Sequence, residues 1–137
     1  MKLLVLHVDD ESDIRRLVQL SLGLDPDIAV HSCACGADAV MVAEEWMPDL
    51  ILCDVMMPGM DGPATLARLR ECPRTAKIPV VFMTARVQSR EVERFRSLGA
   101  DGVIVKPFIA TELADLVRAC LRAAGHAVES AEQRGKT

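Results

Sequence analysis

Short apolar runs alternate with longer amphipathic segments along this 137-residue chain, and the pattern occurs five times. Each apolar run has the length of a strand, and each intervening segment repeats its apolar residues at the spacing of a helix. Such alternation is typical of α/β domains, in which helices cover both faces of a parallel sheet. We predict five strands, at residues 2–8, 28–34, 49–54, 80–84 and 102–106.

The segments between and after the strands each present one apolar face. Its residues are Ile14, Leu17, Val18 and Leu22; Ala39, Val40, Ala43 and Trp46; Leu66 and Leu69; Val92, Phe95 and Leu98; and Leu113, Leu116, Val117, Cys120 and Leu121. Residues that favour helix ends agree with this pattern. We predict Ser12 and Ser89 as N-caps, Pro63 in a first turn, and helix ends at Gly23, Gly99 and Gly125.

Half of the residues are apolar, which is enough for one domain to bury a core without disulfides or a structural metal. We expect this domain to span residues 1–124 and residues 125–137 to form a flexible tail, because that last segment lacks a sustained apolar stripe. Three strands are almost wholly apolar and are predicted in the centre of the sheet, whereas residues 28–34 mix in polar groups and suit an edge.

Composition argues against several classes of function. The apolar run at the N-terminus is short and ends in acidic residues, so it is neither a signal peptide nor a membrane span, and we expect a cytoplasmic protein. A net charge of −4, with only one tryptophan and three phenylalanines, offers no basic patch or stacking surface for nucleic acid. The five cysteines are an odd number without zinc-site spacing, and we interpret them as reduced thiols.

Polar residues whose side chains could take part in a reaction lie where four of the predicted strands end. Asp9, Asp10 and Glu11 follow the first strand, Asp54 ends the third, Thr84 ends the fourth and Lys106 ends the fifth. In a parallel sheet of this kind, ligands bind beyond the carboxyl ends of the strands. Any one of these residues is ordinary in a loop, but their joint placement predicts a site at one edge of the sheet.

The chemistry of this group favours phosphoryl transfer. Carboxylates brought together require either a raised carboxyl pKa or a bound cation, and oxygen ligands without histidine suit Mg²⁺. Lys106 adds a positive charge and Thr84 a hydroxyl, which together with the metal can neutralise a phosphoryl group. We therefore predict Asp54 as the nucleophile, with an acyl phosphate as the product.

Four motifs at these strand ends resemble those of response-regulator receiver domains, the signalling modules of two-component systems. They are Val8-Asp9-Asp10-Glu11, Cys53-Asp54-Val55-Met56-Met57-Pro58-Gly59-Met60-Asp61-Gly62, Phe82-Met83-Thr84-Ala85 and Val105-Lys106-Pro107-Phe108. The resemblance covers residues 1 to about 124 and is to single-domain receivers of the chemotaxis type. It implies a doubly wound, flavodoxin-like α/β fold with five helices and a five-stranded parallel sheet in the order 2-1-3-4-5.

The resemblance also implies roles for individual residues. Asp10 and Asp54 would bind Mg²⁺ through their side chains, Asp9 through water, and Met56 through its carbonyl. Lys106 would pair with the phosphoryl group, Thr84 would hydrogen-bond to it, and the peptide bond before Pro107 would be cis.

Three residues concern how a phosphoryl group would act or be lost. Receivers commonly carry a tyrosine or phenylalanine three residues before the active lysine, and its ring turns inward when the threonine moves. Here that residue is Val103, so we expect a switch that is weaker or relayed through the loop after Thr84. Met56 and Arg86 border the route of the hydrolytic water in the family. Because Met56 offers that water no hydrogen bond, we predict slow self-dephosphorylation.

The sequence therefore favours a phosphoryl-accepting switch over an enzyme: it would catalyse only its own phosphorylation and slow dephosphorylation. A histidine kinase or histidine phosphotransfer protein would be the donor, docking near Ile14-Arg15-Arg16, and an unidentified downstream protein would receive the signal. A scaffold receiver that binds partners without phosphorylation is the alternative. A haloacid-dehalogenase-like hydrolase is disfavoured because Met56 stands where a second aspartate would be the general acid.

Overall fold

The protein forms one five-stranded parallel sheet with the strand order β2-β1-β3-β4-β5, in a computed structural model that describes residues 2–85 and 88–124. The strands are β1 (Leu3–Val8), β2 (Ile28–Cys33), β3 (Leu50–Asp54), β4 (Val80–Thr84) and β5 (Gly102–Val105). The parallel pairing is as predicted from the sequence pattern, and the strand order is the one that the family resemblance implied. The fifth strand ends one residue early, so Lys106 is the first residue after β5 rather than its last.

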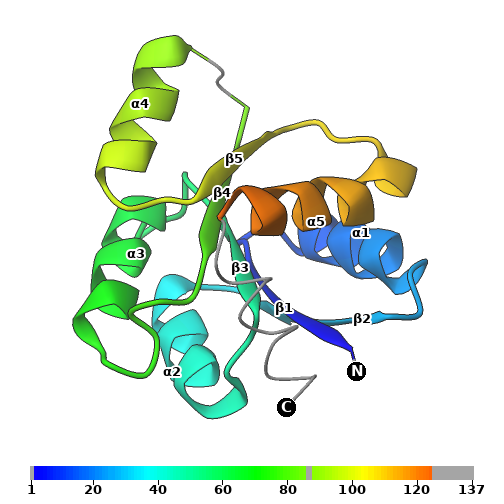
Figure 1. Cartoon of the computed structure of the whole chain (residues 1–137), viewed down its shortest axis with the longest axis horizontal. Helices are drawn as coiled ribbons and strands as arrows, with labels where there is room; N and C mark the ends of the chain where they lie inside the picture. The colour runs from blue at the N-terminus through cyan, green and yellow to red at the C-terminus, as the bar shows by residue number, and fades with distance from the viewer. Residues whose placement is uncertain (1, 86–87, 125–137) are drawn as a thin grey trace.

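Five α-helices connect and follow the strands within the described residues. They are α1 (Ser12–Gly23), α2 (Gly36–Trp46), α3 (Gly62–Glu71), α4 (Ser89–Ser97) and α5 (Leu113–Ala123), the last preceded by a 3₁₀ turn, η1 (Ala110–Glu112). Figure 1 shows α1 and α5 on one face of the sheet and α2, α3 and α4 on the other. The doubly wound fold expected from the sequence is confirmed. None of the described helices has the length and apolarity to cross a bilayer.

The sheet separates two apolar cores, because successive residues of a strand face opposite sides. Val5 packs with α1 and α5 residues such as Val18 and Val117, whereas its neighbour Leu6 packs in the other core with Leu66 and Phe95. All residues of β3 and β4 are buried, as predicted for central strands. Strand β2 lies at an edge, also as predicted.

The beginnings of the helices differ from the sequence prediction. Ser12 and Ser89 are the first helical residues, and the N-cap positions belong to Glu11 and Gln88, neither of which makes a side-chain cap hydrogen bond. The predicted serine caps are therefore wrong by one residue, because each helix begins one residue earlier than predicted and the extended N-cap conformation belongs to the residue before the serine. The side-chain cap of α3 is Asp61, whose Oδ1 accepts a hydrogen bond from the Ala64 amide at 2.9 Å.

The predicted proline and glycine positions are confirmed in part. Pro63 lies in the first turn of α3, as predicted. Gly99 follows α4 with φ of +107°, the left-handed conformation that favours glycine. Helix α1 also ends at Gly23, as predicted, but without a left-handed residue, because Leu24 after it keeps right-handed helical geometry. Gly125 and the predicted tail at 125–137 lie outside the described residues, so the domain boundary at residue 124 stays a prediction.

The amino end of β4 is held by Arg70 of α3. Its guanidinium donates hydrogen bonds to the carbonyls of Ala76, Ile78 and Gly99 and to the carboxylate of Asp101, at 2.7–3.1 Å. Asp101 in turn accepts a hydrogen bond from the Val80 amide at 2.9 Å. One side chain thus joins α3, the segment before β4 and the turn before β5.

Replacing Arg70 with alanine should lower the free energy of unfolding by about 2 kcal/mol, because charge-assisted hydrogen bonds to several backbone carbonyls are lost together. Urea denaturation would measure the loss. The matched control is Arg68→Ala, which removes an exposed arginine from the same helix and should leave the midpoint nearly unchanged. Equal effects of the two substitutions would contradict the role given to Arg70.

Candidate functional site

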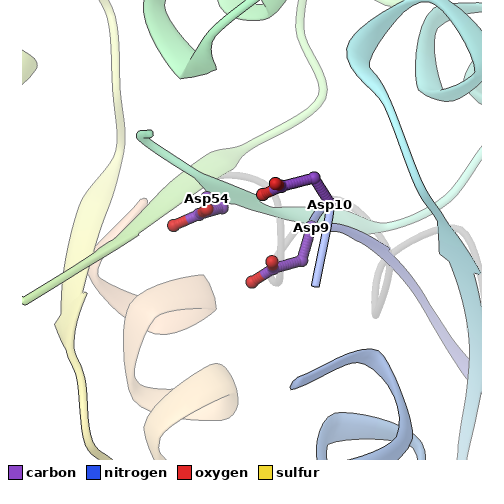
Figure 2. Close-up of side chains that lie close together, drawn as sticks. All are labelled: Asp9, Asp10 and Asp54. Carbon is purple, nitrogen blue, oxygen red and sulfur yellow. The ribbon is translucent and has the colours of Figure 1, made fainter. Parts of the chain in front are cut away.

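Three carboxylates gather at the carboxyl ends of β1 and β3, as predicted from the sequence. Asp9 and Asp10 directly follow β1, and Asp54 ends β3 (Figure 2). Oxygen atoms of the three side chains lie within 4.8 Å of one another. The parallel register explains why Asp9 and Asp54 lie close together. Val8 pairs with Cys53, and the residue that follows each of them in the chain is an aspartate.

Lys106 lies against two of these carboxylates. Its ammonium donates hydrogen bonds to Asp54 Oδ1 at 2.9 Å and to Asp9 Oδ2 at 3.0 Å. The backbone of Lys106 is fixed in turn, since its amide donates to the carbonyl of Thr84 at 2.8 Å. The peptide bond between Lys106 and Pro107 is cis, as the family resemblance implied.

Burial governs the electrostatics of the cluster. Asp9 is fully buried and Asp54 is 6% exposed, whereas Asp10 is open to solvent. Burial raises the pKa of Asp54, and the negative charges of Asp9 and Asp10 raise it further, although the Lys106 hydrogen bond opposes this. The pKa of Lys106 is also raised: burial acts to lower it, but its bonds to Asp54 and Asp9 outweigh burial. The Lys106 ammonium thus contacts two of the three carboxylates, and the cluster keeps an excess of negative charge.

That excess suits a hard divalent cation. The cluster offers carboxylate oxygens from two adjacent strands, one of them on a solvent-exposed residue, and such ligands favour Mg²⁺ with several retained waters. Asp9, Asp10 and Asp54 therefore fit the expected metal. Met56 lies just beyond β3 with 79% of its side chain exposed, and the predicted use of its carbonyl as a ligand stays a prediction.

The remaining predicted residues flank the cluster. Thr84 ends β4, is buried, and pairs with Val105 in the sheet register. Val103 pairs with Phe82 on the neighbouring strand and packs half-buried against the core that contains Phe82 and Phe95. Arg86 lies outside the described residues, so its predicted role is not located.

Two residues, Gly62 and Arg15, were not connected with the acidic cluster from the sequence, although Arg15 lies in the predicted docking segment. Gly62 begins α3 where the helix approaches β3: a Cβ atom there would lie 2.8 Å from the Asp54 carbonyl oxygen and 2.9 Å from Val55 Cα. Arg15 of α1 donates to the Asp9 carbonyl at 2.8 Å. The glycine was visible in the motif after Asp54, but only the three-dimensional approach of α3 gives it a reason.

His7 was also overlooked, because it lies inside the first apolar run. Its side chain is fully buried, and its Nε2 atom lies 3.9 Å from Asp9 Oδ2. Burial, together with the positive charges of Lys106 and Arg15 and against the attraction of Asp9, lowers the pKa of His7 to about 4. The imidazole is therefore neutral near pH 7 and does not offset the negative charge of the cluster.

Comparison with known proteins identifies the class. Residues 5–118 match the response regulator receiver domain. The chain is 36% identical over 117 residues to the phosphate regulon transcriptional regulatory protein PhoB of Rhizobium meliloti, a match that covers 85% of this chain and 51% of that protein. It is 40% identical over 119 residues to the transcriptional regulatory protein SrrA of Staphylococcus aureus, covering 86% of this chain and 47% of that protein.

A solved structure agrees with these sequence matches. The chemotaxis protein CheY4 of Vibrio cholerae superimposes with a TM-score of 0.81 at 28% identity, covering 88% of this chain and 99% of that chain. The chain therefore belongs to the response-regulator receiver family, whose members are signalling switches rather than enzymes that turn over a substrate. It spans about half the length of the curated relatives it matches.

Replacing Gly62 with alanine should displace the end of β3, because the new methyl group would clash with backbone atoms, which cannot move aside as a flexible side chain can. We expect a loss of about 2 kcal/mol in the free energy of unfolding. Amide chemical shifts of Asp54 and Val55 should change as well. In the control Gly23→Ala the added Cβ meets nothing within 4 Å, and this variant should be as stable as the wild type or slightly more so. A Gly62→Ala protein with wild-type stability would disprove the close approach.

Proposed function

We propose that this receiver domain accepts a phosphoryl group on Asp54 in the presence of Mg²⁺ and changes its binding to a partner protein as a result. The observation that carries the proposal is the contact of the Lys106 ammonium with Asp54 inside a cluster of three carboxylates. This geometry supplies a nucleophilic oxygen, a neighbouring positive charge and oxygen ligands for a cation at one point.

The chain's own residues would perform most of the reaction. A carboxylate oxygen of Asp54 attacks the phosphorus of a phosphohistidine, the phosphorus–nitrogen bond breaks, and the imidazole of the donor leaves while an acyl phosphate forms. Lys106 then turns to a phosphoryl oxygen and the Thr84 hydroxyl hydrogen-bonds to another. Asp10, Asp54, the Met56 carbonyl and, through water, Asp9 would hold Mg²⁺, which neutralises charge on the phosphoryl oxygens.

The donor would be a histidine kinase or a histidine phosphotransfer protein, and the α1 segment near Ile14-Arg15-Arg16 would be its docking site. A downstream protein of unknown identity would receive the signal. The net charge of −4 does not favour direct binding to nucleic acid. A cytoplasmic location, as expected from the sequence, stays a prediction.

Val103 affects how phosphorylation would be transmitted. Its short branched side chain has no ring to turn inward when Thr84 moves, and it already packs half-buried against the core beneath α4. We therefore propose a smaller response at α4 than in receivers with an aromatic residue here, or a relay through the loop after Thr84. Chemical shifts on α4 that move as far as in aromatic receivers, on addition of a phosphoryl mimic, would refute this.

Intact-mass measurement tests the proposed chemistry directly. Incubation with a small acyl phosphate donor and Mg²⁺ should add one phosphoryl group to the wild-type chain, and removal of Mg²⁺ with a chelator should abolish the adduct. Asp54→Asn should give no adduct because the nucleophilic oxygen is gone. Asp13→Asn, which removes an exposed carboxylate outside the cluster, should be phosphorylated like the wild type. An adduct that survives Asp54→Asn would overturn the assignment.

The lifetime of the phosphoryl group tests Met56. Met56→Asn should shorten that lifetime, because an amide at this exposed position can hydrogen-bond the attacking water, which a thioether binds only weakly. Decay of the adduct after removal of the donor would measure it. Met41→Asn, at another exposed methionine on α2, is the control and should decay at the wild-type rate. A short wild-type lifetime that Met56→Asn leaves unchanged would contradict the prediction.

A further inference from the structure

His7 is a buried polar side chain whose presence the fold alone does not explain. Its neighbours on β1 are apolar, its exposed area is zero, and its Nε2 atom has no hydrogen-bond partner among the described residues. Buried nitrogen atoms in native proteins almost always have a partner, because leaving one unpaired costs about 1–3 kcal/mol. An apolar residue would fill the same place without that cost.

The surroundings of His7 direct its free nitrogen toward Asp9. The other ring nitrogen, Nδ1, lies 3.5 Å from the Ser32 hydroxyl on β2. If that hydroxyl donates to Nδ1, the single hydrogen of the neutral ring is on Nε2. Nε2 faces Asp9 Oδ2 at 3.9 Å, which is about 1 Å longer than a hydrogen bond.

Asp9 Oδ2 depends on Lys106 in the state that the structure describes. Asp9 Oδ1 accepts from the Glu11 amide at 3.0 Å, and Oδ2 accepts from Lys106 at 3.0 Å. The same ammonium also holds Asp54. If Lys106 follows the negative charge of a phosphoryl group on Asp54, the fully buried Asp9 loses a charge-assisted hydrogen bond at one of its two oxygens.

We propose that His7 is a positioning residue that replaces Lys106 at Asp9 when Lys106 turns to the phosphoryl group. The inference rests on the proposed phosphorylation of Asp54. A shift of about 1 Å brings His7 Nε2–H into hydrogen-bond range of Asp9 Oδ2. His7 thereby keeps the buried carboxylate oriented toward the metal and releases Lys106 for the phosphoryl oxygen.

Two substitutions separate this role from simple filling of the core. His7→Leu removes the donor and replaces an unpaired polar ring with an apolar side chain, so it should fold with equal or greater stability. His7→Gln places an amide nitrogen where Nε2 was and keeps the donor. His31→Leu is the matched control, because this second histidine lies exposed on β2 and its ring packs against Trp46.

The first measurement is the rate of phosphorylation by a small acyl phosphate at saturating Mg²⁺, monitored by intact-mass spectrometry. We expect His7→Leu to react about tenfold more slowly, the size expected for one hydrogen bond to a charged group. His7→Gln should recover most of the rate and His31→Leu should match the wild type. A His7→Leu protein that reacts at the wild-type rate, or a His7→Gln protein as slow as His7→Leu, overturns the proposal.

Imidazole nitrogen spectra give a second and independent readout on the wild-type protein. The His7 ring should be the Nε2–H tautomer, and its Nε2 resonance should move when Mg²⁺ and beryllofluoride, a phosphoryl mimic, are added. If the resonance does not move in a protein that binds beryllofluoride, the role of His7 is overturned. Because this measurement uses the wild-type protein, it holds even where His7→Leu fails to fold. Absence of any Mg²⁺-dependent adduct on wild type would instead overturn the proposed function itself, so the two failures are distinguishable.

Discussion

The contact of Lys106 with both Asp9 and Asp54 is the interaction on which the site depends. The Lys106 ammonium lies 3.0 Å from Asp9 Oδ2, which is 97 positions away in the sequence, and 2.9 Å from Asp54 Oδ1, which is 52 positions away. These contacts close the edge of the sheet between β1, β3 and β5. One ammonium cannot balance three carboxylates, so the cluster keeps a net negative charge. The same contact therefore places a positive charge beside carboxylates that can hold a cation, and the proposed phosphorylation rests on this arrangement.

Much of this arrangement could be predicted from the sequence because it follows from periodicity. Alternating strands and helices determine a parallel sheet, and such a sheet brings residues at the strand ends, here Asp9, Asp54 and Lys106, to one edge. The strand order came from the family resemblance and not from periodicity. The N-caps were wrongly placed at Ser12 and Ser89, because a helix that begins one residue earlier leaves the apolar pattern unchanged.

Other features depend on distances that no pattern in the sequence states. Gly62 is required by the approach of α3 to the Asp54 carbonyl, which is a property of the packed helix. His7 occupies an ordinary position in an apolar strand. Only the structure shows that its Nε2 atom is unpaired and faces Asp9. A buried polar residue inside an apolar run, such as His7, can be interpreted only once its hydrogen-bond partners are known.

The network around Arg70 has a mechanical consequence for the sheet. It anchors the amino end of β4 and the turn before β5, at the opposite end of the strands from the carboxylate cluster. With one end of the strands held, the proposed displacement of Thr84 would bend β4 about that anchor and would not slide the whole strand. The Arg70 network thus ties the sheet at the end away from the carboxylate cluster, so the movement proposed to follow phosphorylation would be concentrated at the other end.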